Sequence, residues 1–150
     1  MSEYHLAQLN VAKMKYPLEA PGMAEFVARL DEINAHADDS PGFVWRLQTG
    51  DGDATGIDFF GTDILVNMSL WTGIDALCDF AFRSAHRQVL ARRGEWFDAM
   101  REAYTVLWWV PAGRIPTLEE AADRLDCLRR EGPGPRAFSF RQAFDPPGPQ

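Results

Sequence analysis

The segment DILVNMSLW, residues 63–71, decides the fold, because it is typical of a strand with two different faces. Ile64, Val66, Met68 and Leu70 alternate along it with Leu65, Asn67, Ser69 and Trp71. Thr72 follows at once as an N-cap residue, with Asp75 three residues further on. We therefore expect a strand that runs directly into a helix, which continues to about residue 97 and can break near Ser84.

Three further strands and two further helices are predicted around this unit. Period-two alternation indicates strands at residues 5–13, 43–49 and 104–112. A helix over 21–37 begins with Pro21 in its first turn, and Thr117 with Glu120 opens a last helix that stops at Gly132. The order β-α-β-β-α-β predicts an α+β, ferredoxin-like antiparallel sheet with two helices on one face, followed by an extra C-terminal helix and an arm.

The domain organisation is simple, because 150 residues suffice for one well-formed core. We expect residues 1–132 to form one domain that includes the C-terminal helix, and residues 133–150 to form a Pro- and Phe-rich arm. Phe138, Phe140 and Phe144 are too aromatic for a simple linker. The arm is therefore expected to pack on the body or on a neighbouring subunit, with only its last residues loose.

Charge and cysteine content exclude several classes of function. A net charge of −7 argues against nucleic acid as a partner, and it gives no reason to expect attraction to an anionic membrane. The N-terminal stretch lacks the apolar core of a signal peptide, and no segment approaches the length of a membrane helix. Cys78 and Cys127 have no cysteine or histidine at metal-ligand spacing, which fits a cytoplasmic protein.

The two faces of the predicted sheet differ in composition. Two helices cover only one face, so we expect the apolar face to lie under them. The second face carries polar groups among bulky apolar ones: Gln8, Asn10, Arg46, Gln48, Asn67 and Ser69. These side chains are expected to point away from the helices into an enclosed space, such as two sheets packed face to face provide, where a few polar groups could orient a small molecule. The alternative is a polar dimer interface without a ligand.

Three stretches resemble a known family: residues 5–34, residues 40–48, and residues 83–97 together with 104–125. Their sequences are HLAQLNVAKMKYPLEAPGMAEFVARLDEIN, SPGFVWRLQ, and RSAHRQVLARRGEWF with YTVLWWVPAGRIPTLEEAADRL. Taken together, over residues 4–141, they resemble the domain of unknown function 3291 family in the dimeric α/β-barrel superfamily. That resemblance implies a homodimer of ferredoxin-like subunits, each with its own cavity. The superfamily includes cofactor-independent monooxygenases, haem enzymes and isomerases, so the resemblance implies a location for a site and no single reaction.

His86 and Arg93 are the candidate catalytic residues, and they lie on one side of the predicted second helix. A histidine at the border of core and solvent could transfer a proton, bind a substrate or ligate haem iron. A structural histidine bonded to Asp79 or to a backbone carbonyl is the alternative. Arg93 and Arg46 are candidates for holding an anionic ligand, whereas Arg87 and Arg92 are expected to be solvated or interfacial.

The candidate substrate-binding residues are the polar groups of the second sheet face together with two tryptophans. Amides and hydroxyls would orient the substrate, and the aromatic rings would stack on it or fill the core and the interface. The set is Gln8, Asn10, Arg46, Gln48, Asn67, Ser69, Trp96 and Trp109.

We interpret the chain as a homodimer that binds a small molecule between sheet and helices. A cofactor-independent monooxygenase or isomerase acting on a planar or anionic substrate is the leading hypothesis. A haem enzyme with His86 as axial ligand is one alternative, and a non-catalytic binding or dimerisation module is another. No other cofactor is predicted. Calcium is rejected for the Asp51–Thr62 loop, because the twelfth position is Thr62 where a calcium loop has glutamate.

Overall fold

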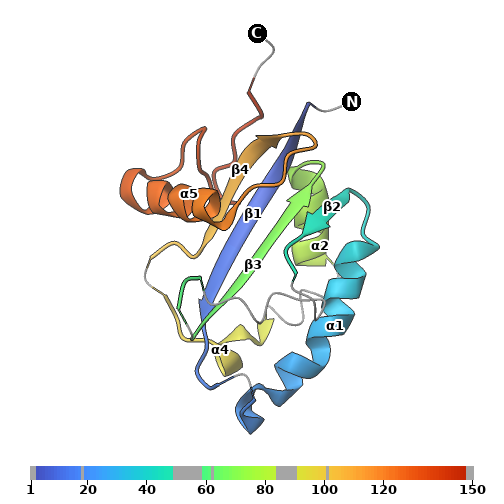
Figure 1. The fold of residues 1–150 in the computed structure, drawn as a ribbon, viewed down its shortest axis with the longest axis vertical. Helices are drawn as coiled ribbons and strands as arrows, with labels where there is room; N and C mark the ends of the chain where they lie inside the picture. Colours follow the sequence, from blue (N-terminus) through green and yellow to red (C-terminus); the bar gives the residue numbers. More distant parts are fainter. Residues whose placement is uncertain are drawn as a thin grey trace.

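Four antiparallel strands form one sheet in the order β2-β3-β1-β4, as Figure 1 shows. The computed structural model describes residues 3–17, 19–48, 59–61, 63–83, 91–100 and 102–147. Its strands are β1 (Tyr4–Lys13), β2 (Phe43–Arg46), β3 (Ile64–Trp71) and β4 (Thr105–Pro111). Its helices are the 3-10 turn η1 (Pro21–Met23), α1 (Ala24–Asp38), α2 (Ile74–Arg83), α4 (Arg93–Trp96) and α5 (Leu118–Glu131).

The ferredoxin-like α+β topology is confirmed. The central strand β1 pairs with β3 from Leu6 opposite Trp71 to Lys13 opposite Ile64. On its other side β1 pairs with β4, which places Asn10 opposite Thr105. Each strand-helix-strand crossover thereby skips one antiparallel neighbour, as expected for this fold.

Two elements differ from their predicted bounds. Helix α2 ends at Arg83, and the short helix α4 follows from Arg93, while residues 84–90 lie outside the described residues. Strand β2 ends at Arg46, and its pairing with β3 shifts register between Phe43 and Trp45. This bulge turns Phe43 to the face of Trp71, whereas simple alternation places Phe43 with Trp45.

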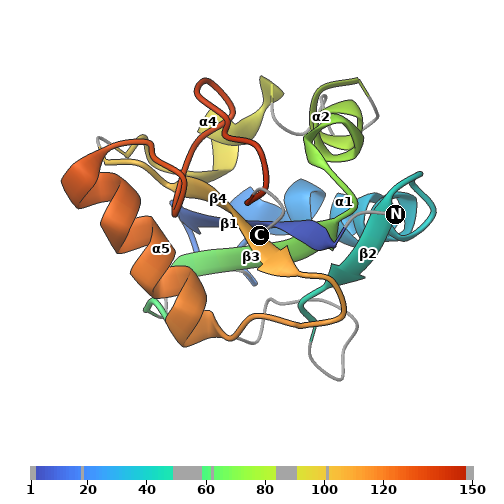
Figure 2. The same cartoon turned by 90° about the horizontal axis from the view of Figure 1, so that it is seen from above.

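The layers on the two faces of the sheet are the reverse of those expected (Figure 2). Helix α5 packs on the apolar face, where Ala121, Leu125 and Leu128 join a core of buried strand residues. Helices α1 and α2 lie over the opposite face, the one that carries Gln8 and Ser69. The prediction that the polar side chains point away from α1 and α2 is therefore wrong, because the C-terminal helix covers the apolar face instead.

The arm also packs on the body of the protein. Phe138 is fully buried, and its backbone N–H and C=O bond to those of Leu107 at 2.9 and 2.8 Å, so the arm adds a short pairing to β4. Further along, the carbonyl of Phe144 accepts a hydrogen bond from Trp109 Nε1 at 2.8 Å. The described part of the arm is thus held in place by backbone pairing and aromatic burial.

Helix α5 begins directly after Thr117, which is its predicted N-cap residue. The Thr117 hydroxyl accepts a hydrogen bond from the N–H of Glu120 at 3.1 Å. The Glu120 carboxylate binds Trp108 Nε1 at 2.9 Å and the guanidinium of Arg114 at 2.8 Å. The first turn of α5 is therefore fastened both to its own cap and to the core of the sheet.

Candidate functional site

A cavity of about 310 Å³ lies between the sheet and the layer of α1, α2 and α4. Side chains from β1, β3 and β4 form its floor, α1 and α2 contribute its apolar walls, and Phe140 of the arm closes one side. Its size falls at the lower end of the range usual for small-molecule sites. The polar groups of the sheet therefore face an enclosed space, although one formed within a single chain.

The polar floor is an ordered network in which Ser69 is central. Gln8 Nε2 donates to Asn67 Oδ1 at 2.5 Å and to Ser69 Oγ at 3.0 Å, and Trp71 Nε1 donates to the same Oγ at 2.8 Å. Gln8 and Ser69 are each only 6% exposed. Because Ser69 Oγ accepts two hydrogen bonds, its own proton is left to donate to a ligand.

A second row of polar groups continues along the floor without internal partners. Asn10 lies between Asn67 on β3 and Thr105 on β4 in the strand register. Asn10, Thr105 and Asn34 of α1 all line the cavity, and their side chains bond to no residue in the described part of the chain. Their hydrogen-bonding capacity is therefore available to a bound molecule.

The charged groups that line the cavity within the described residues are all arginines. Arg29 pairs with Glu25 at 3.2 Å, and Arg46 pairs with Asp38 at 2.8 Å. Arg93 instead lies over the Tyr104 ring, with its guanidinium carbon 4.5 Å from the ring centroid, and no described carboxylate pairs with it. Arg93 is therefore the one positive charge among the described lining residues that no carboxylate neutralises, in a chain whose net charge is −7.

Aromatic rings gather at the opposite end of the cavity. Trp71 stacks on Phe80 of α2, with ring centroids 5.3 Å apart, and Phe43 meets the edge of Trp71 at 5.5 Å. Phe82 and Phe140 form a T-shaped pair at 5.1 Å, and Phe82 is 45% exposed. This end offers apolar surface to a ligand, and the Phe82–Phe140 pair lies where that surface meets solvent.

Six of the ten predicted site residues line the cavity. The cavity brings together Gln8, Asn10, Arg46, Asn67, Ser69 and Arg93. His86 lies outside the described residues.

Gln48, Trp96 and Trp109 do not line the cavity. Gln48 follows the end of β2 and is exposed. Trp96 is buried against Phe26, with ring centroids 5.4 Å apart, and Trp109 is bound to the arm. The early end of β2 removes Gln48 from the cavity, the packing of α4 on α1 removes Trp96, and the docked arm removes Trp109.

Helix α1 forms one wall of the cavity. Phe26, Leu30, Ile33 and Asn34 all line it. Helical spacing predicts that the apolar members of this wall share one face of the helix. Asn34 was not among the predicted site residues, and its polar side chain on the same face of the helix was the available signal.

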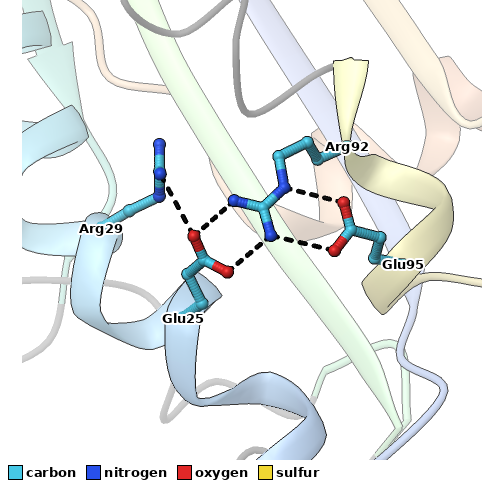
Figure 3. A network of polar contacts seen from close by, with 4 residues as sticks. All are labelled: Glu25, Arg29, Arg92 and Glu95. Carbon is cyan, nitrogen blue, oxygen red and sulfur yellow. Dashed lines mark hydrogen bonds and ion pairs between the residues drawn. The ribbon is translucent and has the colours of Figure 1, made fainter.

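Helix α4 is fixed to α1 by the four-residue ion-pair network in Figure 3. Arg92 forms a two-pronged contact with the Glu25 carboxylate, and it also contacts Glu95 at 2.7 and 2.9 Å. Arg29 reaches the same Glu25 carboxylate. The network lies on the surface, as expected for Arg92, and it places the next residue, Arg93, at the cavity.

We expect this network to persist from neutral pH down to about pH 5 and to open only in acid. Hydrogen bonds from Arg92 lower the pKa of Glu25 from 4.5 to about 2. A carboxyl whose folded pKa is lowered stabilises the fold above its unfolded pKa, and this contribution is lost as the pH falls toward the folded value. A carbon-13 NMR titration of the Glu25 carboxyl checks the value, with Arg92→Gln as the control that returns it toward 4.5. A midpoint near 4.5 in the unaltered protein would contradict the network.

The described residues contain neither a metal-binding cluster nor a helix that could span a membrane. No group of three or more His, Cys, Asp or Glu side chains in the described part of the chain could hold a metal ion. Among the same residues, no helix combines the length and the apolar character that crossing a bilayer requires.

Comparison with known proteins identifies a family and similar solved structures. The family model described as Domain of unknown function (DUF3291) matches residues 5–150. A protein of unknown function from Nitrosomonas europaea is 13% identical, with a TM-score of 0.45 over 77% of this chain and 97% of its own. SnoaB, a cofactor-independent oxygenase from Streptomyces nogalater, is 16% identical, with a TM-score of 0.42 over 76% of this chain and 97% of its own. No curated protein matches the sequence.

Proposed function

The chain belongs to the DUF3291 family, and we propose that it binds a small, planar or anionic organic molecule in the cavity between the sheet and helices α1 and α2. One observation carries this proposal: the partly buried side chains of Asn10, Asn34 and Thr105 line a cavity of about 310 Å³ and have no hydrogen-bond partner within the described residues. A ligand in this cavity could bond to all three, and small-molecule sites typically place a few such polar groups among apolar walls.

The mixture of surfaces supports an organic ligand. Trp71 and Phe80 supply flat apolar surface, while Gln8, Asn10 and Ser69 supply directed hydrogen bonds. Small-molecule sites typically combine these two kinds of lining. An inorganic ion would gain no binding energy from the flat aromatic surface, so this lining favours an organic ligand.

Mass spectrometry of the purified protein, under native and then denaturing conditions, tests the proposal. The expected result is a bound molecule that is released on denaturation, or stabilisation of the protein by planar aromatic compounds in a thermal-shift screen. A bare protein that no such compound stabilises would contradict binding in this cavity.

We expect Asn10→Leu to weaken ligand binding without lowering stability. The Asn10 amide bonds to no described residue, so its loss leaves no protein group unpaired. Losing one hydrogen bond to a ligand corresponds to a fall in affinity of about 2- to 10-fold. Calorimetric titration with the recovered ligand measures this change, and urea unfolding measures stability. Unchanged affinity would place the ligand away from the β1 floor.

The proposal extends to a cofactor-independent monooxygenase or isomerase, in which His86 would act as the acid or base. No His, Cys, Asp or Glu stands among the described lining residues, so proton transfer near neutral pH would depend on His86. His86→Ala is then expected to abolish turnover of the identified ligand while retaining its binding. If turnover continues in this variant, the acid–base role is wrong. If no turnover occurs in either protein, the chain is a non-catalytic binding module.

A histidine-ligated haem would depend on His86, which lies outside the described residues. No His, Cys or Met lines the cavity in the described part of the chain. Among the described lining residues, Tyr104 alone is of a type that ligates haem iron, and Arg93 covers its ring. A Soret band in the purified protein that disappears in His86→Ala would restore the haem alternative.

We also propose a homodimer in a reducing, cytoplasmic setting. The family resemblance implies the dimer, and a reducing setting suits the thiols of Cys78 and Cys127, neither of which forms a disulfide. Because α5 covers the apolar face of the sheet, subunits that pair through their sheets would first have to displace it. Light scattering of the purified protein tests the assembly.

A further inference from the structure

The three arginines that line the cavity are not equivalent. Arg29 and Arg46 each contact a carboxylate, Glu25 and Asp38 respectively. Arg93 has no carboxylate partner in the described part of the chain, and its polar contacts are limited to the faces of two rings, Tyr104 at 4.5 Å and Phe97 at 5.9 Å. A cation on an aromatic face keeps its N–H donors for another acceptor.

The surroundings of Arg93 favour an anion. No described residue that lines the cavity carries a negative charge, although the chain as a whole has a net charge of −7. A cation beside an apolar space is costly when it is unpaired, and a planar guanidinium matches a carboxylate through two parallel hydrogen bonds. A carboxylate on the ligand would therefore be a suitable partner for the Arg93 guanidinium.

Helix α4 holds Arg93 in place before any ligand arrives. Arg92 fixes one side of α4 to α1 through Glu25. Lys15 fixes the other side, because its Nζ donates to the Gly94 carbonyl at 2.5 Å and its backbone N–H donates to the Trp96 carbonyl at 2.8 Å. A preorganised cation loses little side-chain entropy on binding, which raises its value as an anchor.

The anchor and the aromatic surface lie at opposite ends of the cavity. Tyr104, which Arg93 covers, directly precedes Thr105, and Thr105 lies opposite Asn10 on β1. Trp71 at the aromatic end lies opposite Leu6 on the same strand. Four strand residues separate these positions, which corresponds to about 13 Å. A ligand that fills both ends is therefore elongated, with its charge at one end.

We propose that the natural ligand is an elongated amphipathic carboxylate, whose carboxylate binds Arg93 and whose apolar ring system lies against Trp71 and Phe80. The inference rests on the proposed function, because it assigns a substrate class and an orientation to the same cavity. Ser69, opposite Gln8 on β1, lies between the two ends, and Asn10 lies next to the Arg93 end; both can bond to polar substituents of the molecule.

Calorimetric titration with two matched probes, biphenyl-4-carboxylate and biphenyl-4-methanol, tests the inference on the full chain. The carboxylate is expected to bind about 10- to 100-fold more tightly than the alcohol, as for a charge-assisted pair. Arg93→Met is expected to remove this preference, because it lowers the affinity for the carboxylate far more than the affinity for the alcohol. Arg130→Met is the matched control, because Arg130 pairs with Asp126 on α5, across the sheet from the cavity.

The outcomes separate this inference from the proposed function. Equal affinities for the two probes, unaffected by Arg93→Met, would overturn the anion anchor and leave the cavity as a binding site. Failure of both probes to bind would contradict the proposed function as well. If Arg93→Met does not fold, Arg93→Lys replaces it, since loss of the bidentate geometry is expected to lower affinity for the carboxylate alone.

Discussion

Replacing Trp108 with Ala is expected to lower the free energy of unfolding by about 3–5 kcal/mol, the range for deleting a large buried aromatic side chain. Trp108 is fully buried in the core beneath α5, and its Nε1 donates to the Glu120 carboxylate at 2.9 Å. The substitution removes both the ring and the contact that fastens the first turn of α5. Urea unfolding followed by circular dichroism measures the effect.

Trp108→Phe is the matched control, because it keeps an aromatic ring under α5 and removes only the indole N–H and part of the volume. Its expected cost is about 1–3 kcal/mol. A cost below about 1 kcal/mol for Trp108→Ala would mean that α5 does not cover this face. The layer order of the fold would then be incorrect.

Ala37→Phe is expected to weaken binding in the cavity by about 100-fold while changing stability by about 1 kcal/mol or less. Ala37 is buried on α1 and lines the cavity beside Trp71 and Leu77. A new ring there has space to enter, and it occupies the place of the ligand's apolar end. The lost burial of that end corresponds to a fall in affinity of about 100-fold. Calorimetric titration with biphenyl-4-carboxylate measures the loss.

Ala121→Phe makes the same change on the opposite layer. Ala121 is fully buried on α5 in the closely packed core, so the added ring is expected to cost about 1–3 kcal/mol or more. Any variant that remains folded should bind the probe normally. Equal destabilisation by the two substitutions would contradict a cavity under α1.

The topology could be predicted from the sequence because each element carries its own local signal. Alternation along DILVNMSLW, the Thr117–Glu120 cap and the Gly132 stop all lie within short windows, and all are found near their expected positions. The chain order of these elements then permits few sheet arrangements. Local periodicity and connection rules were sufficient for this level of structure.

Which helix covers which face could not be read from the same signals. Alternation on β1 separates Leu9 from Gln8, but it does not state which layer lies above each. The amide-bearing face was expected on the side away from the helices, because the helices were expected to cover the apolar face. The structure instead has a cavity of about 310 Å³ between this face and helices α1 and α2. The polar groups therefore lie under the helices and can bond to a ligand in that cavity.

The floor of the site was predictable, whereas its walls were not. Gln8, Asn67 and Ser69 follow directly from alternation, because a strand fixes its side-chain directions. Phe43 depends on a bulge and Phe140 depends on a docked arm, and both are tertiary features without a local sequence rule.

Intermolecular nuclear Overhauser effects between bound biphenyl-4-carboxylate and the protein test the proposed binding mode most directly. Contacts are expected from the outer ring to Trp71 and Phe80, and from the ring that carries the carboxylate to the side-chain amide protons of Asn10. Contacts confined to the α5 layer, at Leu125 or Leu128, would contradict it.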